Sequence, residues 1–389
     1  MKKIILTSVF TVSLFLIKAQ TISKETNCNS DLVVNNNFPK AAVLDSILKH
    51  YTTNLLPGAT LAIYTEKEGW WVDAQGYADV YKKIPMQNCH LQYLQSVSKT
   101  YMAIEILQLK EQGKINLDEP ITKYLPSKYS HYIKNAKKIT VRMLLNHTSG
   151  VPEYNSNHNF LSQVIQHPLQ DFTPEEMLQS FEGEDLQYAP GSKYQYTNTN
   201  YMLLSLIGDT LTGDHAAYIR EHIFKPLNLT DTYYAKDFNY LQGLNLPASY
   251  WDLENNGTLV DITGFQKMTV EASKGDDGIV CTAADAVKFL KGLMEGKLLS
   301  PESMKEMEDF VKDEKGRKRY GMGLVHFDLG GIEAYGHGGG GVGAGCALLY
   351  IPAYKTYFFI ATNVGVLLDG KLPEKAGEMK DAALMALLK

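Results

Sequence analysis

The spacing of hydrophobic residues changes along this chain from strand-like to helical and back again. Short apolar runs of the kind found in strands stand near both ends of the chain. They cover residues 59–64, 70–74, 321–327, 347–351 and 356–362. A Glu-Lys-Glu-Gly turn at residues 66–69 separates the first two runs, and this pattern predicts a hairpin of an antiparallel sheet.

Helical spacing predicts further elements beside these strands, at residues 40–53, 97–112, 283–294 and 374–388. The segment 97–112 is apolar on nearly all sides, which is typical of a buried helix, and Gly113 ends it. Thr282 is in position to cap the helix that starts at residue 283.

The middle of the chain, from about residue 116 to 270, has mainly helical spacing with long loops. Strand-like ends therefore bracket a helical middle. The simplest topology is one α/β (α+β) module over residues 38–389. Its α/β part would comprise residues 38–115 and 275–389, with a helical insert at about 116–274.

The first 19 residues have the layout of a secretory signal peptide. Lys2 and Lys3 precede an apolar stretch at residues 4–17, and Ala19 offers a cleavage site. A membrane anchor is the alternative, but the stretch is shorter than the ~20 residues that span a bilayer. We expect an exported protein, periplasmic or secreted, with a loose polar leader at residues 20–37 and no stable membrane span after cleavage.

Composition and charge exclude two broad classes. The 389 residues are 44% hydrophobic and 21% charged, which is ordinary for a folded protein and excludes wholesale disorder. The net charge is −5, and removal of residues 1–19, which hold three lysines and no acid, makes it −8. This balance, without a long Lys/Arg run, argues against nucleic acid as a partner.

The cysteines and histidines give no metal pattern. Cys28 and Cys89 stand in polar, loop-like segments and could pair after export, whereas Cys281 and Cys346 lie in apolar runs typical of buried thiols. No Cys-x-x-Cys and no His-Glu-x-x-His occurs. We therefore expect no metal site.

Ser-x-x-Lys occurs twice, as Ser46-x-x-Lys49 and as Ser96-x-x-Lys99. The motif alone is weak, but the second copy opens the predicted buried helix, where residues three apart share one face. A lysine there must be paired or have a lowered pKa, and an amine of lowered pKa can take the proton of a serine. A helix cap beside a lysine that reaches solvent is the equal alternative.

Two further segments could carry chemistry. Tyr196-x-Asn198 precedes an apolar helix, and a phenol beside an ammonium can carry protons, although a hydrogen-bonded core tyrosine is the more common case. Residues 336–343, Gly-His-Gly-Gly-Gly-Gly-Val-Gly, contain Gly-x-Gly-x-x-Gly. A strand-like run follows instead of a helix, which excludes a dinucleotide site. A strand edge without side chains remains, which a substrate can approach and where backbone N–H groups can bind an oxyanion.

In combination these segments resemble the three motifs of the serine β-lactamase and penicillin-binding-protein superfamily. The order is Ser96-x-x-Lys99, Tyr196-x-Asn198 and His337-Gly338-Gly339. The segments 56–59, 117–126, 144–152, 189–191 and 282–285 are similar to its class C-type branch. The resemblance covers about residues 40–365. It implies an antiparallel sheet flanked by helices, an all-helical second domain and an active site at their junction.

The resemblance also implies a mechanism and the residues that perform it. Ser96 would attack a carbonyl and form an acyl-enzyme, while Lys99 and Tyr196 manage the proton, and the sequence leaves open which of them is the base. The backbone N–H groups of Ser96 and Gly340 would form the oxyanion hole. Asn198 would bind a substrate amide. No metal or organic cofactor is implied.

The third motif departs from the β-lactamase pattern. His337-Gly338-Gly339 stands where Lys-Thr-Gly is usual, and it is more similar to the D-aminopeptidase, DD-peptidase and esterase relatives. Gly340 replaces the hydroxyl residue usual in DD-carboxypeptidases. We expect a serine hydrolase in which His337, Gly338 and Gly339 bind the substrate. That substrate would be a small peptide or amide, including those that contain D-amino acids, or an ester.

A β-lactamase or DD-carboxypeptidase is the alternative function, and a non-hydrolytic penicillin-binding sensor is the second. His147 and Tyr154 could lie near the site, but we assign neither a catalytic role. The sequence does not determine the oligomeric state.

Overall fold

A computed structural model describes residues 32–389. The signal peptide expected at residues 1–19, the leader up to residue 31 and Cys28 lie outside the described residues. The last part of the leader lies beside the sheet, where the Asn35 N–H donates to the Trp70 carbonyl at 2.7 Å. Cys89 is disulfide-bonded, and Cys281 and Cys346 are free thiols.

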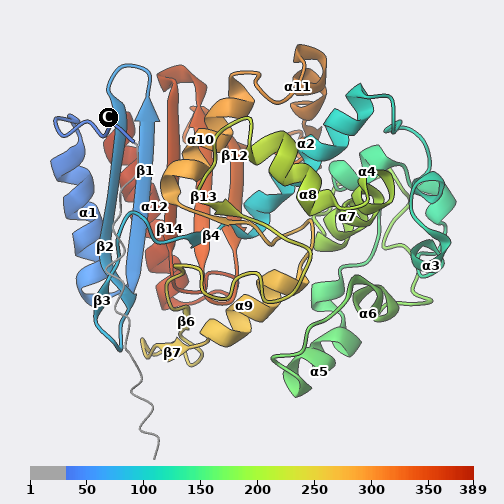
Figure 1. Cartoon of the computed structure of the whole chain (residues 1–389), viewed down its shortest axis with the longest axis horizontal. Helices are drawn as coiled ribbons and strands as arrows, with labels where there is room; N and C mark the ends of the chain where they lie inside the picture. The colour runs from blue at the N-terminus through green and yellow to red at the C-terminus, as the bar shows by residue number, and fades with distance from the viewer. Residues whose placement is uncertain (1–31) are drawn as a thin grey trace, which may run out of the picture.

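The centre of the described chain is a nine-stranded sheet, in the order β3-β2-β1-β14-β13-β12-β11-β10-β9 (Figure 1). Its strands are β1 (Gly58–Thr65), β2 (Gly69–Asp79), β3 (Ile84–Pro85), β9 (Val311–Lys312), β10 (Lys318–Tyr320), β11 (Val325–Asp328), β12 (Glu333–Gly340), β13 (Gly345–Ile351) and β14 (Thr356–Thr362). The first strand of the chain pairs with the last, in antiparallel register from Ala59 opposite Thr362 to Thr65 opposite Thr356.

Smaller strands lie outside this sheet. They are β4 (Gln92–Tyr93), β5 (Thr232–Tyr233), β6 (Tyr250–Trp251), β7 (Val260–Asp261) and β8 (Val280–Cys281). β8 lies between β4 and β5 in a short three-stranded sheet. This pairing brings the segment before the Ser96 motif beside residues 280–281, which lie far along the chain.

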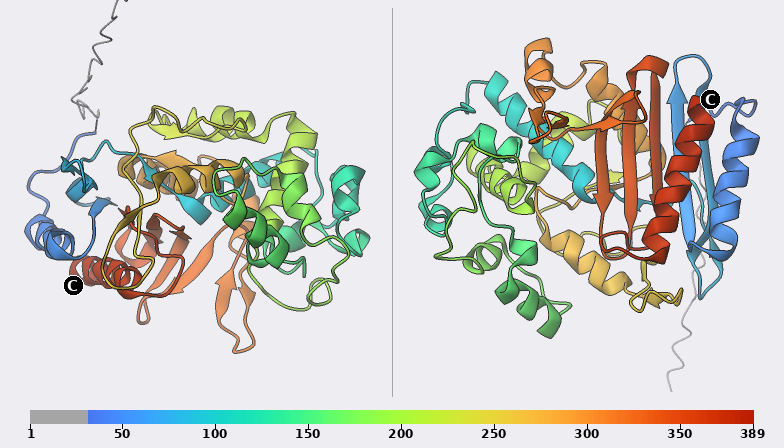
Figure 2. Two further views of the ribbon diagram at one scale, coloured as in Figure 1. Left: turned by 90° about the horizontal axis from the view of Figure 1, so that it is seen from below. Right: turned by 180° about the vertical axis from the view of Figure 1, so that it is seen from behind.

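Helices cover both faces of the large sheet and form the other half of the molecule. They are α1 (Ala41–Asn54), α2 (Ser98–Glu111), α3 (Ser127–Ser130), α4 (Val141–Leu145), α5 (His158–Gln166), α6 (Pro174–Gln179), α7 (Asn198–Thr212), α8 (His215–Ile219), α9 (Thr263–Ala272), α10 (Ala283–Met294), α11 (Pro301–Met307) and α12 (Lys371–Leu388). Figure 2 shows α1 and α12 on one face, while α10 packs on the other. The predicted class, an antiparallel sheet flanked by helices, is confirmed.

The strand predicted at residues 321–327 begins later in the structure, at Val325 of β11. Residues 321–324 form the turn between β10 and β11 rather than the start of a strand. Gly323 has φ +75° there, and a Cβ on it would lie 2.6 Å from the Ala103 side chain of α2. The Gly323 carbonyl also accepts a hydrogen bond from Thr100 Oγ1 at 2.6 Å. The chain therefore turns at this point because it packs directly against α2.

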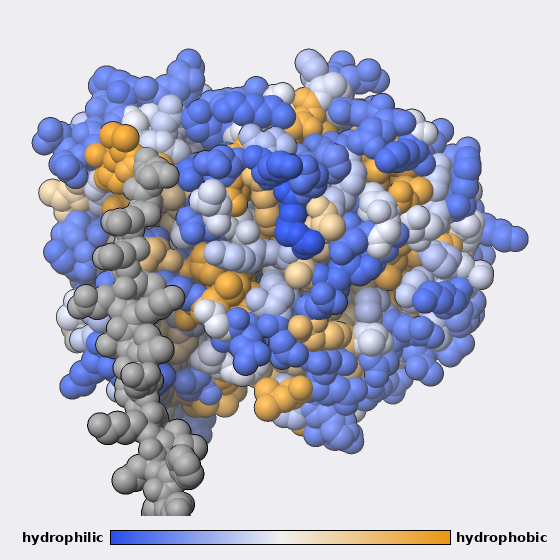
Figure 3. Space-filling model, viewed as in Figure 1, coloured by the Kyte–Doolittle hydropathy of each residue, from blue (hydrophilic) through white to orange (hydrophobic). Residues whose placement is uncertain are grey.

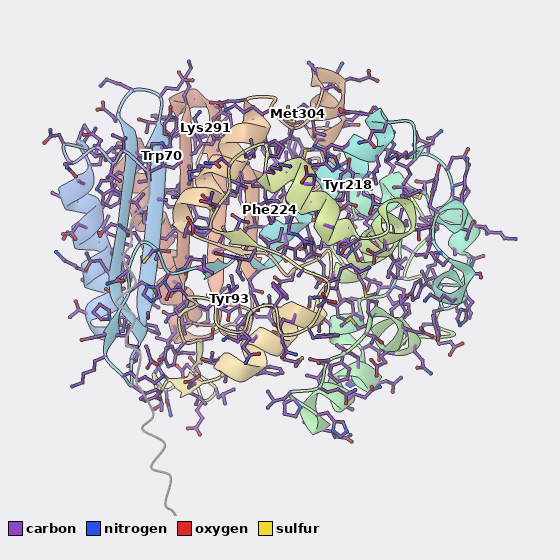
Figure 4. The ribbon with its side chains drawn as sticks, viewed as in Figure 1. Trp70, Tyr93, Tyr218, Phe224, Lys291 and Met304 are labelled. Atoms are coloured by element: carbon purple, nitrogen blue, oxygen red, sulfur yellow. The ribbon has the colours of Figure 1, made fainter. Side chains whose placement is uncertain are left out.

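Helix α2 is buried along most of its length, as its apolar pattern predicts. Tyr101 stacks on Phe289 of α10, with ring centroids 3.5 Å apart. The same ring meets Phe224, labelled in Figure 4, edge to face at 5.8 Å. These contacts fix the helix that begins directly after Ser96.

The face of the molecule shown in Figure 3 is mainly hydrophilic. On the face shown in Figure 3, hydrophobic side chains form separate small patches among hydrophilic ones. Within residues 32–389, no helix is both long enough and apolar enough to cross a membrane.

The glycines of β12 allow this strand to approach the turn that carries Ser96. A Cβ on Gly339 would lie 2.4 Å from the Leu94 carbonyl oxygen and 2.9 Å from Gln95 Cβ. The first of these atoms is backbone and cannot move aside by changing a rotamer. By contrast, a Cβ on the neighbouring Gly338 would meet nothing nearer than the Cys346 carbonyl oxygen at 3.9 Å.

We predict that Gly339→Ala lowers the free energy of unfolding by about 1–3 kcal/mol, because the added methyl overlaps fixed backbone. Gly338→Ala, the matched control, should stay within about 0.5 kcal/mol of the wild type. Urea denaturation of the two variants measures the difference. Equal stability of the two would contradict the proposed close packing.

Candidate active site

Ser96 lies in a 3-10 turn, Gln95–Val97, immediately before α2. Gln95 adopts φ +50°, which is uncommon for a residue other than glycine and turns the chain sharply before Ser96. One helical turn later, Lys99 Nζ donates a hydrogen bond to Ser96 Oγ at 3.1 Å. The second Ser-x-x-Lys differs, because Lys49 is exposed on α1 and pairs with Asp45 at 2.8 Å.

Lys99 is completely buried and has three hydrogen-bond acceptors. Besides Ser96 Oγ, its ammonium donates to Asn198 Oδ1 at 2.7 Å and to the Asp276 carbonyl at 2.8 Å. These acceptors match the three N–H bonds of an ammonium group. Of the two states expected for a buried lysine, paired or with a lowered pKa, the structure shows the paired one.

The pKa values of Lys99 and Tyr196 are both raised above their ordinary values. Burial lowers the pKa of Lys99, but the neighbouring Tyr196 and Asp276 more than offset this effect and leave the pKa above its ordinary value. Burial raises the pKa of Tyr196, although the Lys99 and Ser96 side chains act in the opposite direction.

Tyr196 comes just before α7, and its hydroxyl is buried beside Lys99. Its ring packs on His147, with centroids 4.4 Å apart. Nδ1 of His147 accepts from the Thr197 N–H at 3.3 Å and lies 3.1 Å from Asn200 Nδ2, which places the ring proton on Nε2. Burial holds the pKa of His147 well below 6.5, so this ring is a neutral support behind Tyr196.

His337 on β12 is also neutral and has partners within the protein at both ring nitrogens. Nδ1 donates to the Gly338 carbonyl at 2.6 Å, which leaves Nε2 to accept from the Tyr320 hydroxyl at 3.0 Å. Burial lowers the pKa of His337 to about 3. The ring therefore presents no positive charge to a ligand.

These groups surround a cavity of about 590 Å³. Of the residues expected from the sequence, Ser96, Tyr196, Asn198, His337, Gly338 and Gly340 line it. Lys99 lies behind Ser96, and Gly339 faces the Leu94 carbonyl. The structure therefore brings the expected site residues together from the α2 turn, the start of α7 and the edge of β12.

The cavity also has residues that the sequence analysis did not single out. Two acidic residues, Asp276 and Asp277, are part of its lining. An apolar wall includes Phe160, Leu161, Val164, Phe172, Met177, Phe265 and Met268. The sequence does contain a signal for this acidic pair, because two adjacent acids stand between Gly275 and Gly278 directly before an apolar run. Tyr154, which we expected only near the site, lines the same cavity.

The charges around the cavity are one-sided. Its described lining contains two acids, a neutral His337 and no Lys or Arg. No cluster of three or more potential metal ligands occurs among the described residues. The site thus provides a serine, a buried ammonium, a phenol, amide groups and carboxylates.

The sequence of this chain is similar to those of two bacterial proteins. The putative penicillin-binding protein PbpX of Bacillus subtilis (strain 168) is 30% identical over 252 residues, 64% of this chain and 57% of that protein. Protein flp of Staphylococcus aureus (strain MW2) is 29% identical over 199 residues, 51% of this chain and 39% of its own. The chain covers less than two thirds of the length of either relative.

Two solved structures show the same fold over most of the chain. D-amino acid amidase from Ochrobactrum anthropi SV3 has a TM-score of 0.73 and 25% identity, covering 88% of this chain and 99% of that one. A D-stereospecific amidohydrolase from Streptomyces sp. has a TM-score of 0.75 and 24% identity, covering 87% and 97%. The Beta-lactamase family profile matches residues 44–375, and the protein described here belongs to that family.

Proposed function

We propose that this chain is a serine hydrolase that cleaves small amides, and esters of similar shape, through an acyl-enzyme on Ser96. The observation that carries this proposal is the 3.1 Å contact between Ser96 Oγ and the buried Lys99 ammonium at the wall of the cavity. Membership of the Beta-lactamase family supports it. The export signal expected at residues 1–19 would place the enzyme in the periplasm or outside the cell.

The proposed reaction has two halves. Ser96 Oγ bonds to the substrate carbonyl carbon while its proton passes to the Lys99–Tyr196 pair. The C–N bond then breaks, and the leaving nitrogen takes that proton. Water attacks the resulting ester in the same way, which releases the acid and returns the proton to Ser96. Backbone N–H groups of Ser96 and Gly340, both at the cavity, would stabilise the oxyanion in each half.

Asn198 has two tasks in this scheme. Its Oδ1 accepts from Lys99 Nζ at 2.7 Å, which fixes the orientation of the side-chain amide. The Nδ2 hydrogens then point away from the ammonium and can donate to a carbonyl of the substrate. Asn198 would thereby align the substrate with the same ammonium that contacts the nucleophile.

The charges of the cavity favour amides over β-lactams and over peptides with a terminal carboxylate. Both of the latter carry an anion close to the reacting carbonyl. Asp276 and Asp277 line this cavity, and burial keeps His337 neutral. An anionic substrate would meet like charge here with no cation on the described lining to offset it.

We predict that a serine-directed acylating probe adds one acyl mass to the protein and that Ser96→Ala abolishes this addition. Ser46→Ala is the matched control, since it removes the serine of the other Ser-x-x-Lys, on α1. Intact-protein mass spectrometry reads both variants. Labelling that survives in Ser96→Ala would refute the proposed nucleophile.

A substrate panel separates the hydrolase from its alternatives. D-amino-acid amides and short esters should be turned over, while acyl-D-Ala-D-Ala peptides and a cephalosporin should react slowly. Rapid cephalosporin turnover would favour the β-lactamase alternative. A stable acyl-enzyme that releases no product would favour the sensor.

We also predict that acylation by an uncharged ester becomes faster as the pH rises. Because Lys99 and Tyr196 both have raised pKa values, the pair must lose one proton before it can accept that of Ser96. The rate should increase about tenfold per pH unit between about pH 6 and pH 9. Stopped-flow measurement of the acylation step tests this, and a rate that is constant across this range would contradict it.

A further inference from the structure

The loop that carries Asp276 is fixed relative to the nucleophile. The main-chain carbonyl of Asp276 accepts a hydrogen bond from Lys99 Nζ at 2.8 Å, and the same ammonium contacts Ser96 Oγ at 3.1 Å. Gly275, at φ +83°, packs so closely that a Cβ would lie 2.5 Å from the Tyr201 carbonyl oxygen. The main chain at Asp276 is therefore held at a defined position, linked to the reacting serine through the Lys99 ammonium.

Only one of the two carboxylate oxygens of Asp276 accepts a hydrogen bond from the described residues. Its side chain lines the cavity although the residue is only 3% exposed. Oδ2 accepts from the Tyr154 hydroxyl at 3.0 Å. Oδ1 is buried, and no group within residues 32–389 donates a hydrogen bond to it. A buried carboxylate oxygen without a donor is unfavourable, and a bound donor, best a cationic one, would remove that cost.

Nearby cations of the protein do not fill this role. The three N–H bonds of Lys99 are already directed at Ser96, Asn198 and the Asp276 carbonyl. Burial raises the pKa of Asp276 to about 6 and that of Asp277 to about 8. Burial is the main cause of both shifts, and the charge of Lys99, which lowers both pKa values, does not offset it.

The rest of the cavity is suited to a large apolar group. Its wall beyond the acidic pair consists of aromatic and aliphatic side chains from α5, α6, α9 and the loops between them. Burial of a group such as a phenyl ring against this wall is favourable. The cavity thus combines a nucleophile, a neighbouring carboxylate and an apolar pocket.

We infer that Asp276 binds the free ammonium group of the substrate. The substrates would then be amides or esters of amino acids with a free α-amino group and a large apolar side chain, rather than N-acylated compounds. In such molecules one carbon bears the ammonium, the side chain and the reacting carbonyl, which matches the three features of the cavity. This inference rests on the proposed function and specifies its substrate class.

A purely structural role for Asp276 makes a different prediction. If the side chain served only to anchor Tyr154, its loss would affect substrates with and without an amino group equally. Asp276→Asn separates the two roles, because the amide oxygen can still accept from Tyr154 while the negative charge is gone.

The experiment compares D-phenylalanine methyl ester with methyl 3-phenylpropanoate, which lacks only the amino group. For the wild type, kcat/KM should be higher for the amino ester. In Asp276→Asn the ratio of the two kcat/KM values should fall about 10- to 100-fold, the effect of losing a charged hydrogen bond. Asp185→Asn, which changes an acid that is 84% exposed, is the matched control and should keep the wild-type ratio.

Two outcomes would overturn the inference. One is an unchanged ratio in Asp276→Asn, even if both rates fall, and the other is a wild type with no preference for the amino ester. Failure of the proposed function looks different, because neither ester would then acylate Ser96 in the wild type. Binding of phenethylamine to Ser96→Ala, measured by calorimetry, provides a second readout that needs no turnover. Asp276→Asn in that background should weaken binding about 10-fold or more, and unchanged binding would overturn the inference.

Discussion

The site depends on one buried ammonium group with three acceptors. Lys99 connects the turn that carries Ser96, the start of α7 at Asn198 and the loop at Asp276. Asn198 is 99 residues and Asp276 is 177 residues away from Lys99 along the chain, so no local interaction could bring these segments together. Because a buried charge is costly unless all its hydrogen bonds are made, the ammonium requires this geometry.

The same constraint explains the charge balance of the cavity. Lys99 lies behind the nucleophile and directs its three N–H bonds at protein groups, so that none is left to bind an anionic ligand. The two histidines near the site are neutral through burial, and each has a tautomer set by its hydrogen bonds. Asp276 and Asp277 therefore face the cavity without a cation on its described lining. A substrate that brings its own positive charge is the natural complement.

Much of the architecture could be predicted because it depends on local patterns. The apolar run at residues 356–362 is strand β14 without change, and Thr282 caps α10 with its side chain, as expected. The glycine run at 336–343 was interpreted as an open strand edge, and β12 ends within it. The position of the turn at 321–324 could not be predicted, since it follows from contact with α2.

The site could be predicted only as far as spacing and motif order allow. The spacing of Ser96 and Lys99 indicates their contact, and the order of the motifs indicates which tyrosine and which strand join them. The state of Lys99 depends on Asp276 and Asn198, whose proximity is a property of the tertiary fold. For the same reason the acidic pair, which is inconspicuous in the sequence, emerged only from the cavity.

The most direct test of this account is the charge state of Lys99, measured by NMR of the Nζ nitrogen in protein labelled with nitrogen-15 lysine. Lys274 provides an internal comparison, because burial lowers the pKa of this second buried lysine to about 8. The signals are assigned with Lys99→Arg and Lys274→Arg. The account predicts that Lys274 titrates near pH 8 while Lys99 keeps the chemical shift of an ammonium up to at least about pH 9. Titration of Lys99 near neutral pH would show that it is a free base rather than the cation that organises the site.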